Sequence, residues 1–122
     1  MQYMLLIYHN ENELTQAERQ DCYKESTQVV HDINAAGQYL GAAPLHHTST
    51  ATSLRIRDGK RLITDGPFAE TREQLGGFFL IKADDLDQAI GIAERLPMAK
   101  RGTIEIRPVI ELDNLPVLET AG

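Results

Sequence analysis

Residues 50–81 read TATSLRIRDGKRLITDGPFAETREQLGGFFLI, and this stretch decides the fold. Two β-rich runs flank Asp58-Gly59, a dipeptide typical of the two-residue turn of a hairpin, so a β-hairpin is predicted over residues 51–64. Pairing outward from the turn gives a mainly apolar face and a mainly cationic face: Leu54, Ile56, Arg61 and Ile63 share the first, and Arg55, Arg57, Lys60 and Leu62 share the second. Residues 65–68 have the composition of a turn, and this turn is expected to follow the second strand of the hairpin.

A strand that is apolar on both faces follows the hairpin. Gly76-Gly77 leads into FFLI at residues 78–81, and a second run of this kind, QYMLLIY, lies at residues 2–8. Strands of this kind are covered on both sides. Helices are the expected cover on one side, and in so small a chain a second subunit is the candidate cover for the other.

Two helices and two further strands complete the pattern. The first helix begins at a capping box formed by Thr15 and Glu18, and the second begins after the capping residue Asp85. Short strands are predicted at residues 39–45 and 103–110.

Without the hairpin, the order of these elements is βαββαβ, the ferredoxin-like arrangement of an α+β fold. The interpretation is one domain over residues 1–110, with the hairpin inserted at residues 51–64 and an acidic tail at residues 111–122. The two helices cover one face of an antiparallel sheet, and the other face stays open and apolar. Such a patch usually marks an interface, so a homodimer through the open sheet face is predicted.

Composition and charge exclude several kinds of partner and site. The chain of 122 residues has 12 basic and 18 acidic residues, a net charge of −6, whereas nucleic acids and anionic membranes are bound through cationic patches. Its one cysteine, Cys22, excludes an internal disulfide and a cysteine-based zinc site. With no membrane-length apolar run and no leader, a cytoplasmic location is expected. No dinucleotide or phosphate-binding fingerprint occurs, so no cofactor is expected.

The stretch at residues 50–81 closely resembles the DGPF-motif proteins of the YCII-related (YciI-like) family. The resemblance extends from MLLIY at residues 4–8 to IEIRPV at residues 104–109, and DGPFAETREQLGGFF at residues 65–79 is its most specific part. It implies the dimeric α/β-barrel superfamily, in which two ferredoxin-like sheets pack face to face. That expectation agrees with the two-sided strands.

The resemblance implies less about activity. Most members of the family have no established activity. Some YciI-type relatives resemble small-molecule lyases or dehydrochlorinases that use a His–Asp pair, and DGPF-type proteins are often linked with extracytoplasmic-function sigma factors. The paired histidine is expected on the first helix, where this chain has DCYKES at residues 21–26, so the pair does not carry over intact.

Asp65 and His46 are the candidate catalytic residues. Asp65 opens the DGPF turn, where its carboxylate is either a general base at a cavity mouth or a cap of the turn amides. His9 and the adjacent His46 and His47 follow two parallel strands at one sheet edge, where an imidazole is suited to acid/base work. Adjacent extended residues point to opposite faces, so at most one of His46 and His47 joins a given site. Solvated loop histidines and a metal site are the alternatives.

Arg72, Glu70, Tyr8 and Tyr23 are the candidate substrate-binding residues. Arg72 is suited to clamping a carboxylate and Glu70 to acting as a base, or both belong to an ion-pair network. The tyrosines either line a cavity with their hydroxyls or pack in the core.

We therefore expect a homodimer with a small-molecule pocket between the sheet face and the DGPF loop, without a metal or cofactor. The hypothesis is acid/base chemistry of the lyase or isomerase type on a small anionic or carbonyl-bearing molecule. The alternative is a non-catalytic ligand-sensing or interaction protein in a regulatory, sigma-factor-linked setting.

Overall fold

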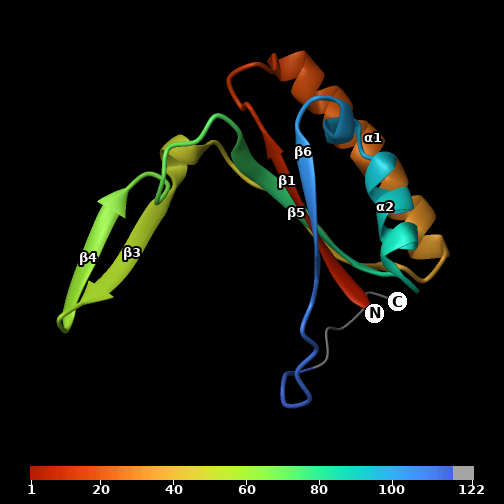
Figure 1. Cartoon of the computed structure of the whole chain (residues 1–122). Coiled ribbons are helices and arrows are strands. Elements are labelled where there is room, and N and C mark those ends of the chain that lie inside the picture. Colours follow the sequence, from red (N-terminus) through yellow and green to blue (C-terminus); the bar gives the residue numbers. More distant parts are fainter. Residues whose placement is uncertain (117–122) are drawn as a thin grey trace.

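A four-stranded antiparallel sheet with the strand order β2-β5-β1-β6 forms the centre of the fold. The computed structural model describes residues 1–116 (Figure 1). The strands of this sheet are β1 (Gln2–His9), β2 (Tyr39–Pro44), β5 (Gln74–Lys82) and β6 (Thr103–Pro108). Helices α1 (Gln16–Ala35) and α2 (Leu86–Glu94) cover one face of the sheet, as Figure 1 shows. This is the ferredoxin-like α+β arrangement, and the predicted fold class is confirmed.

Strands β1 and β2 run in the same direction, because each pairs antiparallel with β5, which lies between them. Their carboxyl ends therefore meet at one edge of the sheet. Two short 3₁₀ helices, η1 (Thr48–Thr50) and η2 (Pro97–Lys100), follow β2 and α2. The chain that leaves both β1 and β2 thus turns at the same end of the molecule.

The capping box at the start of α1 forms as the sequence predicts. Thr15 Oγ1 accepts a hydrogen bond from the Glu18 amide, and Glu18 Oε1 accepts one from the Thr15 amide, each at 3.1 Å. Arg101 Nη2 lies 2.7 Å from Glu18 Oε2. The Thr15 amide and the Arg101 guanidinium together lower the pKa of Glu18 below its ordinary value.

The core lies between the sheet and the two helices. Its buried side chains alternate along the strands, as they do at Tyr3, Leu5 and Ile7 of β1. The helices supply Val29, Ile33, Ala89, Ile92 and Ala93, and β5 supplies Phe79 and Ile81. The neighbouring residues Met4, Leu6 and Tyr8 belong to the opposite face of the sheet, which no helix covers (Figure 1).

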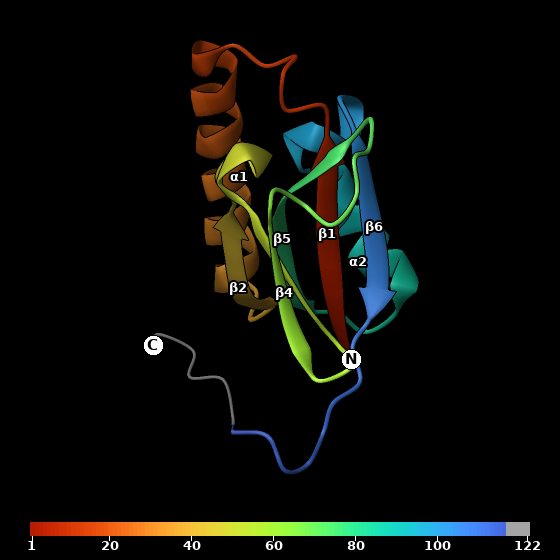
Figure 2. The same cartoon turned by 90° about the vertical axis from the view of Figure 1, so that its left-hand side faces the viewer.

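Strands β3 (Thr52–Arg57) and β4 (Lys60–Asp65) form a separate two-stranded sheet, which we call the arm. Its turn residues Asp58 and Gly59 have φ angles of 52° and 73°, as a two-residue hairpin turn of this type requires. The arm projects away from the sheet on the side opposite the helices (Figure 1), and in Figure 2 it lies in front of the open sheet face. The predicted hairpin is present, but it stands apart from the core.

The end of the chain differs in detail from the prediction. The last strand ends at Pro108, and no helix or strand follows it within the described residues, up to residue 116. The remainder of the predicted tail, residues 117–122, lies outside the described residues. Across residues 1–116, no helix is both long enough and apolar enough to cross a membrane.

Candidate functional site

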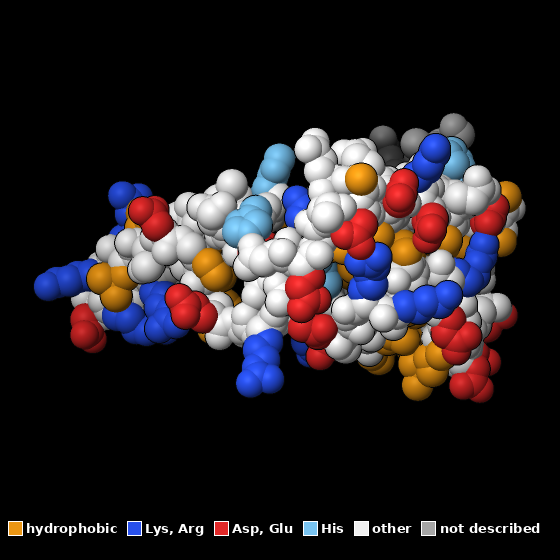
Figure 3. Space-filling model, turned by 90° about the horizontal axis from the view of Figure 1, so that it is seen from above, with side chains coloured by type: hydrophobic (Ala, Val, Ile, Leu, Met, Phe, Trp, Pro, Cys, Tyr) orange, Lys and Arg blue, Asp and Glu red, His pale blue; other side chains and the backbone are white. Residues whose placement is uncertain are grey.

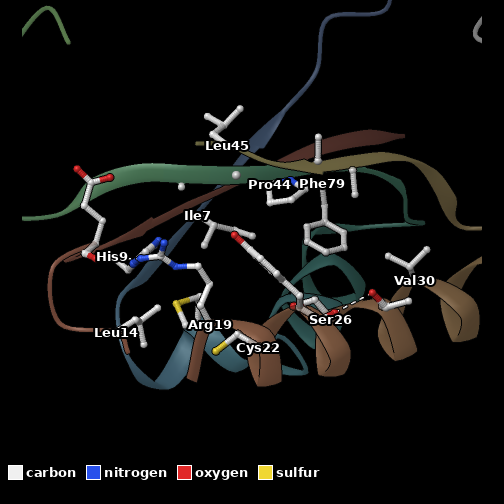
Figure 4. A pocket seen from close by; sticks show the side chains of 18 of the residues that line it. Ile7, His9, Leu14, Arg19, Cys22, Ser26, Val30, Pro44, Leu45 and Phe79 are labelled. Atoms are coloured by element: carbon white, nitrogen blue, oxygen red, sulfur yellow. Dashed lines mark hydrogen bonds between the residues drawn. The ribbon is translucent and has the colours of Figure 1, made fainter. Parts of the chain in front are cut away.

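A cavity of about 330 Å³ lies between α1 and the sheet, on the helix-covered face. Its volume falls in the range of small-molecule sites, and most of its lining is apolar. The imidazole and the guanidinium lie at one end: in Figure 4, His9 and Arg19 are at one end of the pocket, and Phe79 and Val30 are at the other. A ligand that is apolar along most of its length and polar at one end fits this lining.

His9 is the last residue of β1, and the alternation of the strand turns its side chain to the same face as Leu5 and Ile7. The ring packs against Gly76, where a Cβ atom would lie only 2.3 Å from His9 Nε2. Gly76 is the extra residue of a β-bulge, since Ile7 pairs with Gly77 and Tyr8 with Leu75. The bulge and the glycine together make room for an imidazole at the polar end of the pocket.

At least one ring nitrogen of His9 makes no hydrogen bond with the described residues. His9 Nδ1 is buried and has no hydrogen-bond partner among the described residues. A buried polar nitrogen without a partner is costly, so such a group calls for a ligand or a water molecule. A ring nitrogen without a partner in the protein is free to exchange a proton with a bound molecule.

Glu11 lies two residues beyond β1 and is the one buried charged side chain among the described residues, with 9% exposed. Its carboxylate accepts hydrogen bonds from the Thr48 amide, at 3.1 Å, and from the Thr48 hydroxyl. Its amide donates to Gln74 Oε1 at 3.1 Å, and its carbonyl accepts from Arg19 Nη2 at 3.2 Å. Glu11 therefore ties the ends of β1 and β2 to β5 and α1 around the polar end of the pocket.

His47 pairs with this carboxylate. Its Nε2 lies 3.3 Å from Glu11 Oε1 and 3.2 Å from Asn12 Oδ1, while its Nδ1 accepts a hydrogen bond from the Ser49 amide at 3.1 Å. Because Nδ1 accepts, a neutral ring carries its proton on Nε2, directed toward the two oxygens. His47 therefore holds the 3₁₀ turn η1 against the loop after β1.

Arg19 and Cys22 reach the pocket from α1. The guanidinium of Arg19 forms no ion pair with a carboxylate among residues 1–116, so its positive charge is available to an anion in the pocket. Burial raises the pKa of the Cys22 thiol above its ordinary value, so the thiol stays protonated at neutral pH. Cys22 is a packed wall residue rather than an activated nucleophile.

The family model for the YCII-related domain matches residues 1–113. The chain belongs to the YCII-related family. This YCII-related chain is 37% identical over 118 residues to an uncharacterized protein of Rhizobium meliloti (strain 1021), a match that covers 89% of this chain and 92% of that protein.

A solved structure is similar in fold. It is that of 5-chloro-2-hydroxyhydroquinone dehydrochlorinase from Burkholderia phenoliruptrix AC1100, in complex with 2,5-dihydroxybenzoquinone. The TM-score is 0.55, the sequence identity is 14%, and the match covers 90% of this chain and 94% of that chain. At this identity the similarity shows the fold alone.

One of the six site residues predicted from the sequence of this YCII-related chain lies in the wall of the pocket. Tyr23 lines the pocket. Tyr8 lies on the open face of the sheet, next to His9 but on the other side. Asp65 ends the arm, and His46, Glu70 and Arg72 are exposed and do not line the pocket. Their proposed roles stay predictions.

Of the two adjacent histidines, His47 lines the pocket and His46 does not. Glu11 and Arg19 were missed by the sequence analysis. A signal for Glu11 was available in its position just after β1, at the edge where His9 and His47 were expected to meet. Within residues 1–116, no group of three or more His, Cys, Asp or Glu side chains is placed to hold a metal ion.

Proposed function

We propose that this YCII-related protein is a cofactor-free acid/base enzyme of the lyase or isomerase type. Its substrate is a small carbonyl-bearing or anionic molecule bound between α1 and the sheet. The observation that carries the proposal is the imidazole of His9, which has an unpartnered buried nitrogen at the polar end of an apolar pocket. Imidazole is the side chain best suited to proton transfer near neutral pH.

His9 removes a proton from the carbon next to the substrate carbonyl, and the negative charge then develops on the carbonyl oxygen. The Arg19 guanidinium and the Tyr23 hydroxyl, both in the pocket wall, are donors suited to that oxygen. Loss of a leaving group from the neighbouring carbon completes an elimination. Return of the proton from His9 to a different carbon completes an isomerisation. Neither route needs an oxidant or a reductant.

Glu11 and His47 are positioning residues in this proposal. Through Thr48, Gln74 and Arg19 they hold the segments around the polar end of the pocket. The similar Burkholderia structure is that of a dehydrochlorinase, which by its name catalyses an elimination, and its ligand, 2,5-dihydroxybenzoquinone, is a cyclic carbonyl compound. It supports the reaction class as an analogy of fold.

We also infer that the chain belongs to the DGPF-motif subgroup, because residues 65–68 read DGPF. A homodimer through the open sheet face is part of the same proposal. The half-buried apolar side chains of that face, among them Met4, Leu6 and Phe78, support it.

Exchange of carbon-bound hydrogen for deuterium tests the chemistry without knowledge of the product. Small cyclic ketones, hydroxyquinones and keto acids are first screened for binding by the slowing of Cys22 alkylation, because Cys22 lines the pocket. Each compound that binds is incubated with the protein in D₂O, and the loss of the proton signal is followed by NMR. Wild-type protein is compared with His9→Gln and with the matched control His31→Gln, since His31 is exposed on α1 and does not line the pocket.

We expect the carbon-bound hydrogen of a bound compound to exchange for deuterium faster with wild-type protein or His31→Gln present than in D₂O without protein. His9→Gln is expected to slow the exchange by about 100-fold or more, the usual contribution of a general acid or base. Compounds that bind but never exchange, with wild-type protein and His9→Gln alike, would support the non-catalytic ligand-sensing alternative instead. Loss of exchange in Asp65→Asn or His46→Gln, with His9→Gln active, would move the site to the residues predicted from the sequence.

A further inference from the structure

The arm exposes apolar side chains that its own fold does not cover. All six residues of β4 and five of the six residues of β3 are exposed. Leu54 and Ile56 are 60% and 64% exposed, and Ile63 and Leu62 are also exposed. A two-stranded hairpin with no further packing is marginally stable in water, and exposed apolar patches of this kind mark interaction surfaces. The arm therefore needs a surface against which to pack.

The register of the arm sorts its side chains into two faces. Leu54 pairs with Ile63 and Ile56 pairs with Arg61, so these residues share one face, which we call the apolar face of the arm. Arg57 pairs with Lys60 on the other face, and two like charges directly opposite each other are unfavourable unless another group neutralises them. Figure 3 shows Lys and Arg side chains gathered around the outer end of the arm.

The charge of the arm is opposite to that of the rest of the chain. Residues 52–65 hold four basic residues and two acidic ones, a net charge of +2. The whole chain has 12 basic and 18 acidic residues, so the remainder has 8 basic and 16 acidic residues, a net charge of −8. None of the ion pairs among residues 1–116 involves a cation of the arm. A second copy of the same chain offers the acidic surface that the arm lacks.

A second copy also offers the apolar surface. The arm lies on the side of the open sheet face, opposite the helices, and stands away from that face (Figures 1 and 2). A second chain seated against the open face is therefore within reach of the arm of the first. Two-fold symmetry makes the contact reciprocal, since each arm then reaches the other chain.

We propose that the arm is a clasp between two copies of this chain: the apolar face of each arm, formed by Leu54, Ile56 and Ile63, packs against the second copy. The cations of the arm lie against the acidic body of that copy. The proposal rests on the homodimer inferred above but not on the chemistry proposed for His9, because its readout is the state of association rather than activity.

The test is the dissociation constant of the dimer, measured by sedimentation equilibrium. The triple variant Leu54→Thr, Ile56→Thr, Ile63→Thr removes apolar area but keeps residues that favour strands, so the hairpin still forms. The matched control carries Leu86→Thr and Leu112→Thr, which change exposed leucines outside the arm. We expect a wild-type dimer, an unchanged control, and a dissociation constant raised on the order of 100-fold in the triple variant.

Trypsin reports the position of the arm directly, because the arm holds four of the 12 Lys and Arg residues of the chain and none of the four precedes a proline. We expect cleavage of the arm to be slow at concentrations above the dissociation constant and fast below it, and added salt to weaken the dimer. A wild-type chain that is still monomeric at about 100 µM, which is about 100 times a micromolar dissociation constant, would overturn the proposal. That result would overturn the homodimer as well. A triple variant that dimerises as tightly as wild type, or an arm that is cut equally fast at every concentration, would overturn the clasp alone.

Discussion

Replacement of Glu11 by Gln tests the interpretation that this buried carboxylate holds the polar end of the pocket together. Its oxygens accept from the Thr48 amide at 3.1 Å and from the Thr48 hydroxyl, and they face His47 Nε2 at 3.3 Å. Glutamine keeps the shape but replaces one acceptor oxygen by an NH₂ group. That group then faces either a Thr48 donor or the proton of His47 Nε2. Two donors that face each other cannot form a hydrogen bond, so one hydrogen bond is lost.

The expected loss follows from the hydrogen bonds affected. Hydrogen bonds to a charged group contribute about 1.5–3 kcal/mol, and Glu11→Gln loses on the order of one such bond. For a domain of this length, each 1 kcal/mol lowers Tm by about 3–5 °C, so we expect a fall of about 5–15 °C in a thermal melt. The pocket ligand is expected to bind more weakly as well, because Arg19 loses the fixed position of the Glu11 carbonyl.

The matched control is Glu13→Gln in the same loop. Glu13 is exposed and accepts one hydrogen bond, from Asn10 Nδ2 at 3.2 Å. Its replacement is expected to change the free energy of unfolding by less than about 0.5 kcal/mol. If the melts of Glu11→Gln and Glu13→Gln both coincide with that of wild type, Glu11 does not anchor the site.

Of three further predictions, two concern the wall of the same pocket and the third concerns the capping box of α1. Gly76→Ala is expected to keep the fold but displace the His9 ring, because the new Cβ would lie 2.3 Å from His9 Nε2; proton exchange then falls by about 10-fold or more, whereas Gly91→Ala, with open space around it, leaves exchange unchanged. Burial raises the pKa of Cys22, so iodoacetamide is expected to alkylate it more slowly than an unfolded control at neutral pH and faster as the pH rises; equal rates would contradict this. The pKa of Glu18 is lowered in the folded state, so its stabilising effect is present above its ordinary value of 4.5 and is lost as the pH falls through the folded value. Urea unfolding of wild type and Glu18→Gln is therefore expected to differ at pH 7 and to converge in acid, and a difference that is constant with pH would refute the capping interpretation.

Local signals in the sequence predict most of the fold. The capping box of Thr15 and Glu18 starts α1, and the Asp58-Gly59 turn sets the register of the arm. The parallel direction of β1 and β2 brings His9 and His47 to one edge of the sheet. These features depend on short-range backbone chemistry and on one topology, so a single sequence is enough to predict them.

The site needed contacts that no local pattern contains. Glu11 looks like a surface residue of a turn, and its burial comes from Thr48, which is 37 residues away in the chain. Whether His46 or His47 faces the pocket depends on how the chain turns into η1, where His47 caps the helix through the Ser49 amide. The bulge at Gly76, which admits the His9 ring, follows from the pairing of β5 with β1.

The four histidines of the chain provide the most direct test of the proposed site. Two of them, His9 and His47, line the pocket, and His31 and His46 do not. The measurement is the ¹H–¹³C NMR signal of each ring during titration with a compound that slows the alkylation of Cys22, assigned by single His→Gln variants. The account predicts that the signals of His9 and His47 move together while those of His31 and His46 stay in place. Movement of the His46 signal with an unchanged His9 signal would contradict it.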